Sequence, residues 1–232
     1  MLPRHSSQHR TVSDRHEQRR ASALCRRVTD TVRFVTTQGP PSEPEPFRTA
    51  VESMTSAAVR PEIKLGPIRP PQRLAPFSYA LGAEIKHSAS EPVGEYSDGD
   101  AFGRLILLYD PQGDEAWQGT LRLVAYIQAD VDAALAEDSL LPEVAWSWLH
   151  DALEGRTAEY VALGGTITAT TSVRFGEIAG PPKAHQLEMR ASWTSQTLMI
   201  KPQVEAFCEV LEYAAGLPPV GITSISNRFP TA

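Results

Sequence analysis

Two groups of polar side chains in this sequence have the types and spacing to do chemistry. The first lies in residues 110–119, where Asp110, Asp114 and Glu115 supply three carboxylates. Carboxylate oxygens are the ligands that Mg²⁺ and Ca²⁺ prefer in proteins. The spacing does not match that of an EF-hand loop, so the sequence favours the alternative, a solvated turn anchored by Trp117.

The second group comprises Glu143, Trp146 and His150, spaced i, i+3 and i+7 on the polar side of a helix expected at residues 140–153. A tryptophan on that side of the helix is typical of an exposed anchor at a protein interface. The alternative is that another part of the chain covers it, because tryptophan is highly buried on average. His150 with Glu143 is also a candidate acid–base pair.

Motifs that carry known reactions are absent from the sequence. Gly164-Gly165-Thr166 lacks the spacing and the lysine of a phosphate-binding loop, no nucleophile elbow occurs, and His87, His150 and His185 are isolated. Cys25 and Cys208 are the two cysteines and form no CxxC pair, which fits a reducing compartment and argues against zinc. We therefore expect no catalytic residues, no cofactor and no metal ion, while leaving open an enzyme with an unrecognised acidic or histidine site.

The charge of the chain is divided unevenly. Residues 1–45 carry eight arginines and five acidic residues, which gives +3, so a net charge of −6 for all 232 residues leaves −9 for residues 46–232. An acidic body does not attract nucleic acid through its overall field, and binding by the basic residues 1–45 is the remaining route. No apolar run has the roughly 18 residues of a spanning helix, so we expect a soluble, cytoplasmic protein that does not enter a membrane.

Residues 1–45 are expected to be a disordered basic arm that ends in a Pro-rich linker, since they lack a sustained apolar period. Three interpretations remain open for this arm: a solvated tail, an annotated start placed too far upstream, and a contact with nucleic acid or an acidic partner. Residues 222–232 are expected to be a flexible tail.

Residues 46–221 are expected to form a single α+β domain. Apolar residues at helical spacing predict helices over 46–58, 140–153 and 202–216, with a shorter one over 130–137. Period-two alternation predicts strands over 77–86, 102–109, 121–127, 159–177 and 187–193, with a turn at 110–113 and a loop at 88–100. Because hairpins dominate this order, we predict a mainly antiparallel sheet of five to six strands with about three helices on one face.

Several ordered blocks carry a family resemblance. They are Pro71-Gln-Arg-Leu-Ala-Pro76, Asp114-Glu-Ala-Trp-Gln-Gly-Thr120, Leu140-Leu-Pro-Glu-Val-Ala-Trp-Ser-Trp148, Glu188-Met-Arg-Ala-Ser-Trp193 and Ala215-Gly-Leu-Pro-Pro219. From residue 46 to about residue 221 the chain resembles the actinobacterial domain-of-unknown-function 3000 family. The resemblance implies a bacterial, cytoplasmic protein and carries over no activity, cofactor or catalytic residue. It also hints at RNA metabolism.

Three functional hypotheses follow from the sequence. The first is a non-enzymatic binding or accessory module with a protein partner, which the missing catalytic set and Trp146 favour. The second is an enzyme that uses Asp110, Asp114 and Glu115 around a metal, or His150 with Glu143. The third is a protein associated with RNA metabolism, and it requires a basic face that the acidic body argues against.

Overall fold

The computed structural model describes residues 43–85, 101–177 and 183–219. The predicted loop at 88–100, most of the arm at 1–45 and the tail at 222–232 lie outside these residues.

The described residues form one six-stranded antiparallel sheet with the strand order β1-β2-β3-β4-β6-β5. The strands are β1 (Ile63–Pro67), β2 (Phe77–Ile85), β3 (Ala101–Asp114), β4 (Gly119–Asp130), β5 (Tyr160–Val173) and β6 (Lys183–Ser195). Period-two alternation lets each central strand bury one side and leave the other side open. The prediction of a mainly antiparallel sheet is confirmed.

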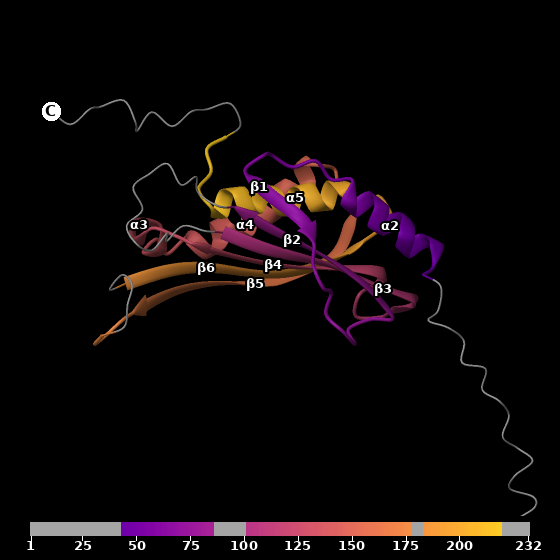
Figure 1. The fold of residues 1–232 in the computed structure, drawn as a ribbon, viewed down its shortest axis with the longest axis horizontal. Helices are drawn as coiled ribbons and strands as arrows, with labels where there is room; N and C mark the ends of the chain where they lie inside the picture. The colour runs from indigo at the N-terminus through magenta and orange to yellow at the C-terminus, as the bar shows by residue number, and fades with distance from the viewer. Residues whose placement is uncertain (1–42, 86–100, 178–182, 220–232) are drawn as a thin grey trace, which may run out of the picture. The chain divides into compact units, whose positions relative to one another are not determined.

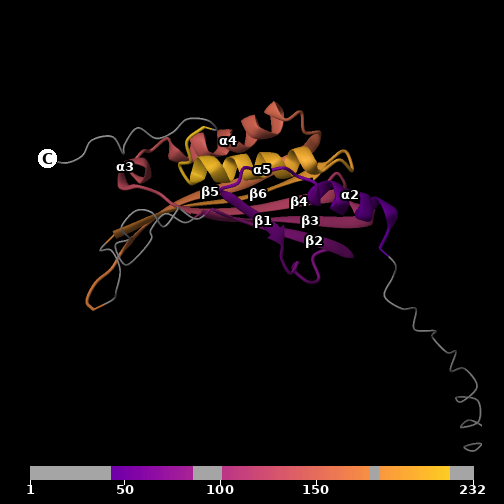
Figure 2. The same ribbon diagram turned by 45° about the horizontal axis from the view of Figure 1, so that its top comes forward.

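Four helices accompany the sheet in the described residues: α2 (Glu45–Thr55), α3 (Ala133–Ala136), α4 (Leu141–Gly155) and α5 (Lys201–Ala214). Proline occupies the first turn of α2, α4 and α5, where its missing N–H costs no hydrogen bond. Figure 2 shows α2, α4 and α5 above one face of the sheet. The α+β fold with helices on one face is therefore as predicted.

The hydrophobic core lies between this helix layer and the covered face of the sheet (Figure 1). Trp193 of β6 and Phe207 of α5 are its largest fully buried side chains. Helix α5 contacts the central strands β3 and β4 and also packs against α4. This arrangement leaves the outer faces of α4 and α5 as the upper surface of the domain.

Two parts of the fold differ from the prediction. Strand β1 was not predicted, and it pairs along the edge of β2. The turn predicted at 110–113 lies instead at 115–118, because β3 continues to Asp114 through an irregularity in its pairing with β4. Asp110 and Pro111, which favour a turn in the sequence, therefore lie within the lengthened strand β3.

Within the described part of the chain, none of the helices combines the length and the apolar character that crossing a bilayer requires.

Candidate functional site

The outer side of α5 borders an open cavity of about 450 Å³, here named the α5 groove. One wall is the segment that follows α2, and another is the C-terminal end of α4. Its lining residues are Ala58, Val59, Arg60, Arg156, Glu205, Cys208, Glu209, Glu212, Tyr213, Leu217, Pro218 and Pro219. Glu205, Glu209 and Glu212 recur at i, i+4 and i+7, so helical spacing places three carboxylates along one side of the groove.

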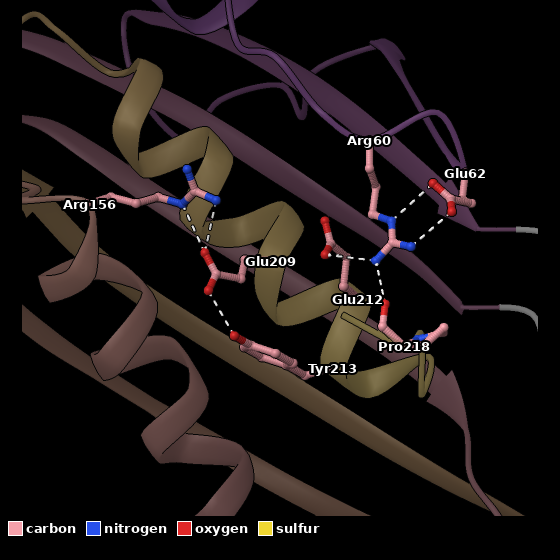
Figure 3. A network of polar contacts seen from close by, with 7 residues as sticks. All are labelled: Arg60, Glu62, Arg156, Glu209, Glu212, Tyr213 and Pro218. Carbon is pink, nitrogen blue, oxygen red and sulfur yellow. Dashed lines mark hydrogen bonds and ion pairs between the residues drawn. The ribbon is translucent and has the colours of Figure 1, made fainter. Parts of the chain in front are cut away.

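Arg60 holds one half of the groove together (Figure 3). Its guanidinium makes a two-pronged contact with Glu62, with Nε 3.0 Å from Oε2 and Nη2 2.8 Å from Oε1. Nη1 donates to the carboxylate of Glu212 at 3.3 Å and to the carbonyl oxygen of Pro218 at 3.1 Å. Arg60 thereby ties α5 and the segment after it to the start of β1.

Arg156 organises the other half. Its Nη2 lies 2.9 Å from Oε2 of Glu209, and its Nη1 lies 3.3 Å from Oε2 of Glu205. The hydroxyl of Tyr213 donates to the second oxygen of Glu209 at 2.8 Å (Figure 3). The backbone N–H of Ala58 donates to Glu205 at 3.0 Å. These carboxylates are held in place by donors from three separate segments.

Burial changes the pKa values of two side chains that line the groove, Glu212 and Cys208. Desolvation raises the pKa of the Glu212 carboxyl, and the hydrogen bond from Arg60 opposes that shift. Burial also raises the pKa of the Cys208 thiol to about 12. A thiol with that pKa stays protonated at neutral pH and is a poor nucleophile.

An apolar strip continues from the groove across α4. Tyr213 lines the groove, and its ring lies 6.0 Å from that of Trp148. Val144 and Leu140 precede Trp148 by one and two helical turns, and their side chains are exposed. We call the α5 groove together with Leu140, Val144, Trp148 and Tyr213 the α4–α5 surface. Helical spacing puts Val144 in the same apolar stripe as Leu141, Ala145 and Leu149, which are buried, but the Val144 side chain is exposed.

The predicted group on α4 lies on the side of the helix that faces β5. Trp146 is partly buried against the core, and a Cβ atom at Gly165 of β5 would lie 2.9 Å from its ring. His150 is exposed, with Nδ1 3.1 Å from the hydroxyl of Tyr160 and Nε2 3.2 Å from Glu154. Glu143 is exposed. The structure does not bring Glu143 and His150 into a hydrogen bond, and the interaction patch stays a prediction.

The predicted acidic turn binds its own backbone. Oδ1 of Asp110 accepts from the N–H of Gln112 at 2.9 Å, and Oδ1 of Asp114 accepts from the N–H of Ala116 at 2.8 Å. Glu115 is exposed in the turn between β3 and β4. In residues 43–85, 101–177 and 183–219, no three His, Cys, Asp or Glu side chains lie close enough together to hold a metal ion.

The uncovered face of the sheet carries a row of Arg104, Tyr126 and Arg190 across three strands. The guanidinium of Arg190 lies 5.7 Å from the centroid of the Tyr126 ring, and its Nε lies 2.9 Å from Glu188. Arg122 on the same face donates to protein oxygens of β5 and β6. These two arginines thus have acceptors inside the protein. That the acidic body does not attract nucleic acid stays a prediction.

Sequence reasoning missed most of this site. The glutamates of α5 had a detectable signal, because their spacing marks one acidic side of a predicted helix. Arg60 had no such signal in the sequence, since its partner Glu212 lies 152 positions away. Helical spacing puts Trp148 in one stripe with the buried Leu141, Ala145 and Leu149, while the structure leaves it partly exposed beside Tyr213.

Replacing Arg60 by alanine should lower the free energy of unfolding by about 1–3 kcal/mol, because Glu212 loses a charged donor in a partly buried position. Urea denaturation followed by circular dichroism measures the change. The matched control is Arg156→Ala, since the Arg156 side chain is 36 % exposed and that of Arg60 only 10 %. The control should cost under about 1 kcal/mol, and equal losses for the two variants would contradict this reasoning.

The ion pair of Glu62 predicts a pH dependence. The hydrogen bond from Arg60 lowers the pKa of Glu62 from 4.5 to about 2. A carboxyl with a depressed folded-state pKa adds stability that is present above its unfolded pKa and is lost as the pH falls. Stability should therefore decline more steeply between pH 4.5 and about 2 in the wild type than in Glu62→Gln. Thermal melts across this range test it, and parallel curves would refute it.

Cys208 should resist alkylation in the folded protein, since its side chain is 1 % exposed and its pKa is about 12. With iodoacetamide at about pH 8 we expect labelling at least about 100-fold slower than in urea. Mass spectrometry of the peptide that contains Cys208 gives the rate. Equal rates in the folded and unfolded protein would show a reactive thiol instead.

Comparison with known proteins assigns the chain to a family. No curated protein and no solved structure matches it significantly. Residues 43–223, which include the described sheet, the helices α2 to α5 and the α4–α5 surface, match the model of the family described as "Protein of unknown function (DUF3000)". Because the match covers most of the sequence, the chain belongs to this domain-of-unknown-function family.

Proposed function

We propose that this chain is a non-enzymatic binding module that holds a segment of a protein partner on the α4–α5 surface. The observation that carries the proposal is the junction of Trp148 and Tyr213, where an exposed apolar strip meets an acidic groove. Aromatic side chains beside a polar rim are typical of the residues that dominate binding energy in protein interfaces. The proposal includes a cytoplasmic location, which the free buried thiol of Cys208 supports.

The shape of the surface favours an extended or helical segment over a small molecule. The exposed strip covers two helical turns of α4, from Leu140 to Trp148, and the groove continues it along α5. A segment lying on both would place apolar side chains on the strip. This is the kind of burial that a contiguous exposed apolar patch favours.

Charge favours a cationic group at the groove end of that segment. Three glutamates line the groove against two arginines. Outside the lining, Glu62 adds a carboxylate next to Arg60, and Lys201 adds a cation 3.9 Å from Glu205. Glu209 and Glu212 are oriented by their arginines and by Tyr213 before any ligand arrives. A lysine or arginine of the partner would find preorganised acceptors there.

A peptide-display selection against the full chain tests the proposal. Selected peptides should combine apolar positions with a lysine or arginine. Their dissociation constants should rise by about 30-fold or more in Trp148→Ala, as expected for a residue at the centre of an interface. Fluorescence anisotropy with labelled peptides gives these constants.

Trp146→Ala is the matched control, since both tryptophans lie on α4. The predicted patch of Glu143, Trp146 and His150 is the alternative contact, and binding lost only in Trp146→Ala would move the site there. Selection of acidic peptides, or of none, would overturn the proposal. Circular dichroism of both variants shows that each is folded.

A further inference from the structure

The last strand of the sheet has an open edge. β5 pairs with β6 on one side, and within the described part of the chain no strand pairs with its other side. From Gly164 to Val173 nearly every residue is exposed. Gly165 still lies close to Trp146 of α4, and Figure 1 shows the end of β5 reaching beyond α4 and α5. Among the described residues, no strand pairs with the backbone N–H and C=O groups that point outward from this edge.

From Gly164 to Val173 this edge lacks charge and proline, which usually prevent pairing, and the irregularity of β5 lies before this half, between Val161 and Gly164. Residues 160–173 contain no charged residue and no proline, whereas edge strands are commonly short or carry lysine or proline. The opposite edge of the same sheet has these features, since β1 is five residues long, contains Lys64 and ends at Pro67. This contrast between the two edges of one sheet favours β5 as the edge that pairs with another strand.

The two sides of the exposed half of β5 differ in chemistry. Residues that face one another in an antiparallel pair share a face of the sheet, so the partners on β6 define two rows. The hydroxyl groups of Thr166, Thr168, Thr170 and Ser172 form one row. The other row is mainly apolar and consists of Ile167, Ala169, Thr171 and Val173, of which Val173 is 49 % exposed.

We propose that β5 pairs antiparallel with β5 of a second copy of this chain, about a two-fold axis at Thr170. Thr168 then faces Ser172 of the second copy, and Ile167 faces Val173 of the second copy. Hydroxyl faces hydroxyl at Thr168 and Ser172, and apolar faces apolar at Ile167 and Val173, which are favourable cross-strand pairs. Between them, Ala169 faces Thr171 of the second copy. The inference does not rest on the proposed function, because it uses a different surface.

Self-pairing fits this strand better than a different partner strand does. An isologous interface requires one patch that complements itself, and an uncharged strand places no like charges opposite one another. Residues 168–173 are all exposed, so none of them has to leave the core for the pairing to form. The pairing joins two six-stranded sheets into one and covers Val173.

Sedimentation velocity on the full chain, from about 1 to about 100 µM, tests the pairing, because a single strand pair is a small interface. We expect a monomer–dimer equilibrium in this range. Thr170→Lys places two lysines opposite one another at the axis, and like charges there destabilise pairing. The dimer dissociation constant should rise by at least about 10-fold.

Thr120→Lys is the control, since it makes the same change at an exposed residue of β4 that is not on a sheet edge. It should leave the dissociation constant unchanged. A wild type that is monomeric at every concentration, or equal behaviour of the two variants, would overturn the proposal. Thermal melts establish that both variants fold.

Cross-linking tests the register. Facing residues in an antiparallel pair have Cα atoms about 4.5–5.5 Å apart, within the range that a disulfide spans. In a Cys25→Ser background, Thr170→Cys should form an interchain disulfide on mild oxidation. Val173→Cys faces Ile167 and should not. Equal cross-linking of both variants would contradict a two-fold axis at Thr170.

Discussion

Replacing Trp193 by alanine should lower the free energy of unfolding by about 3–5 kcal/mol, the cost of deleting a large buried aromatic side chain. Trp193 lies on β6 beneath the helix layer and is 0 % exposed. Its Nε1 donates to Oε1 of Gln203 at 2.7 Å, and Nε2 of that fully buried glutamine donates to Oγ of Ser195 at 2.6 Å. The alanine variant leaves a cavity and also removes the donor of Gln203. Urea denaturation followed by circular dichroism gives the change.

Trp193→Phe separates the two contributions. Phenylalanine keeps most of the ring volume but has no N–H, so Gln203 loses its donor while the cavity stays small. We expect a loss of about 1–3 kcal/mol, the cost of an unsatisfied buried polar group. A loss under about 1 kcal/mol in Trp193→Ala would show that this part of the core is not closely packed.

Replacing Gly165 by alanine should destabilise the protein by about 1–3 kcal/mol, the usual cost of forcing extra volume into a packed site. A Cβ atom there would collide with the backbone oxygen of Arg190 and lie 2.9 Å from Cα of Ala191. Backbone atoms of a paired strand cannot move aside as a flexible side chain can. The methyl group should therefore push β5 away from β6 and displace Trp146 of α4.

The neighbouring residue supplies the control for this prediction. A Cβ atom at Gly164 would meet nothing within 4 Å, so Gly164→Ala should change stability by no more than about 0.5 kcal/mol. Chemical denaturation compares the two variants. Hydrogen exchange of the β5 amides should accelerate in Gly165→Ala alone, and equal behaviour of the two alanine variants would contradict the steric argument.

The hydrophobic periodicity of the sequence was enough to predict most of the elements. Alternation over 121–127 and 187–193 predicted β4 and β6, and helical spacing over 140–153 and 202–216 predicted α4 and α5, each within a few residues. These patterns are local, because they depend only on which side of an element is buried. Strand β1 was missed because only Ile63 and Leu65 alternate in so short a segment.

Such local patterns could not predict most of the candidate site. Arg60 binds Glu212 from 152 positions away, and no local spacing encodes that meeting. On α4 the sequence singled out Trp146, while Trp148 forms the aromatic pair with Tyr213. Which of the two tryptophans meets a ring of α5 depends on how α4 and α5 pack together, which no local spacing specifies.

By itself, the sequence determined the class of the fold, since alternating and helical periodicities specify which face of each strand and helix is buried. Tertiary structure alone decided which exposed faces lie next to one another, as in the groove between α5 and residues 58–60 and the strip across α4. It also decided that β5 lies at an edge of the sheet. The physical reason is that the spacing of apolar residues within each helix or strand determines which of its faces is buried. The meeting of two surfaces depends instead on how whole elements pack against one another.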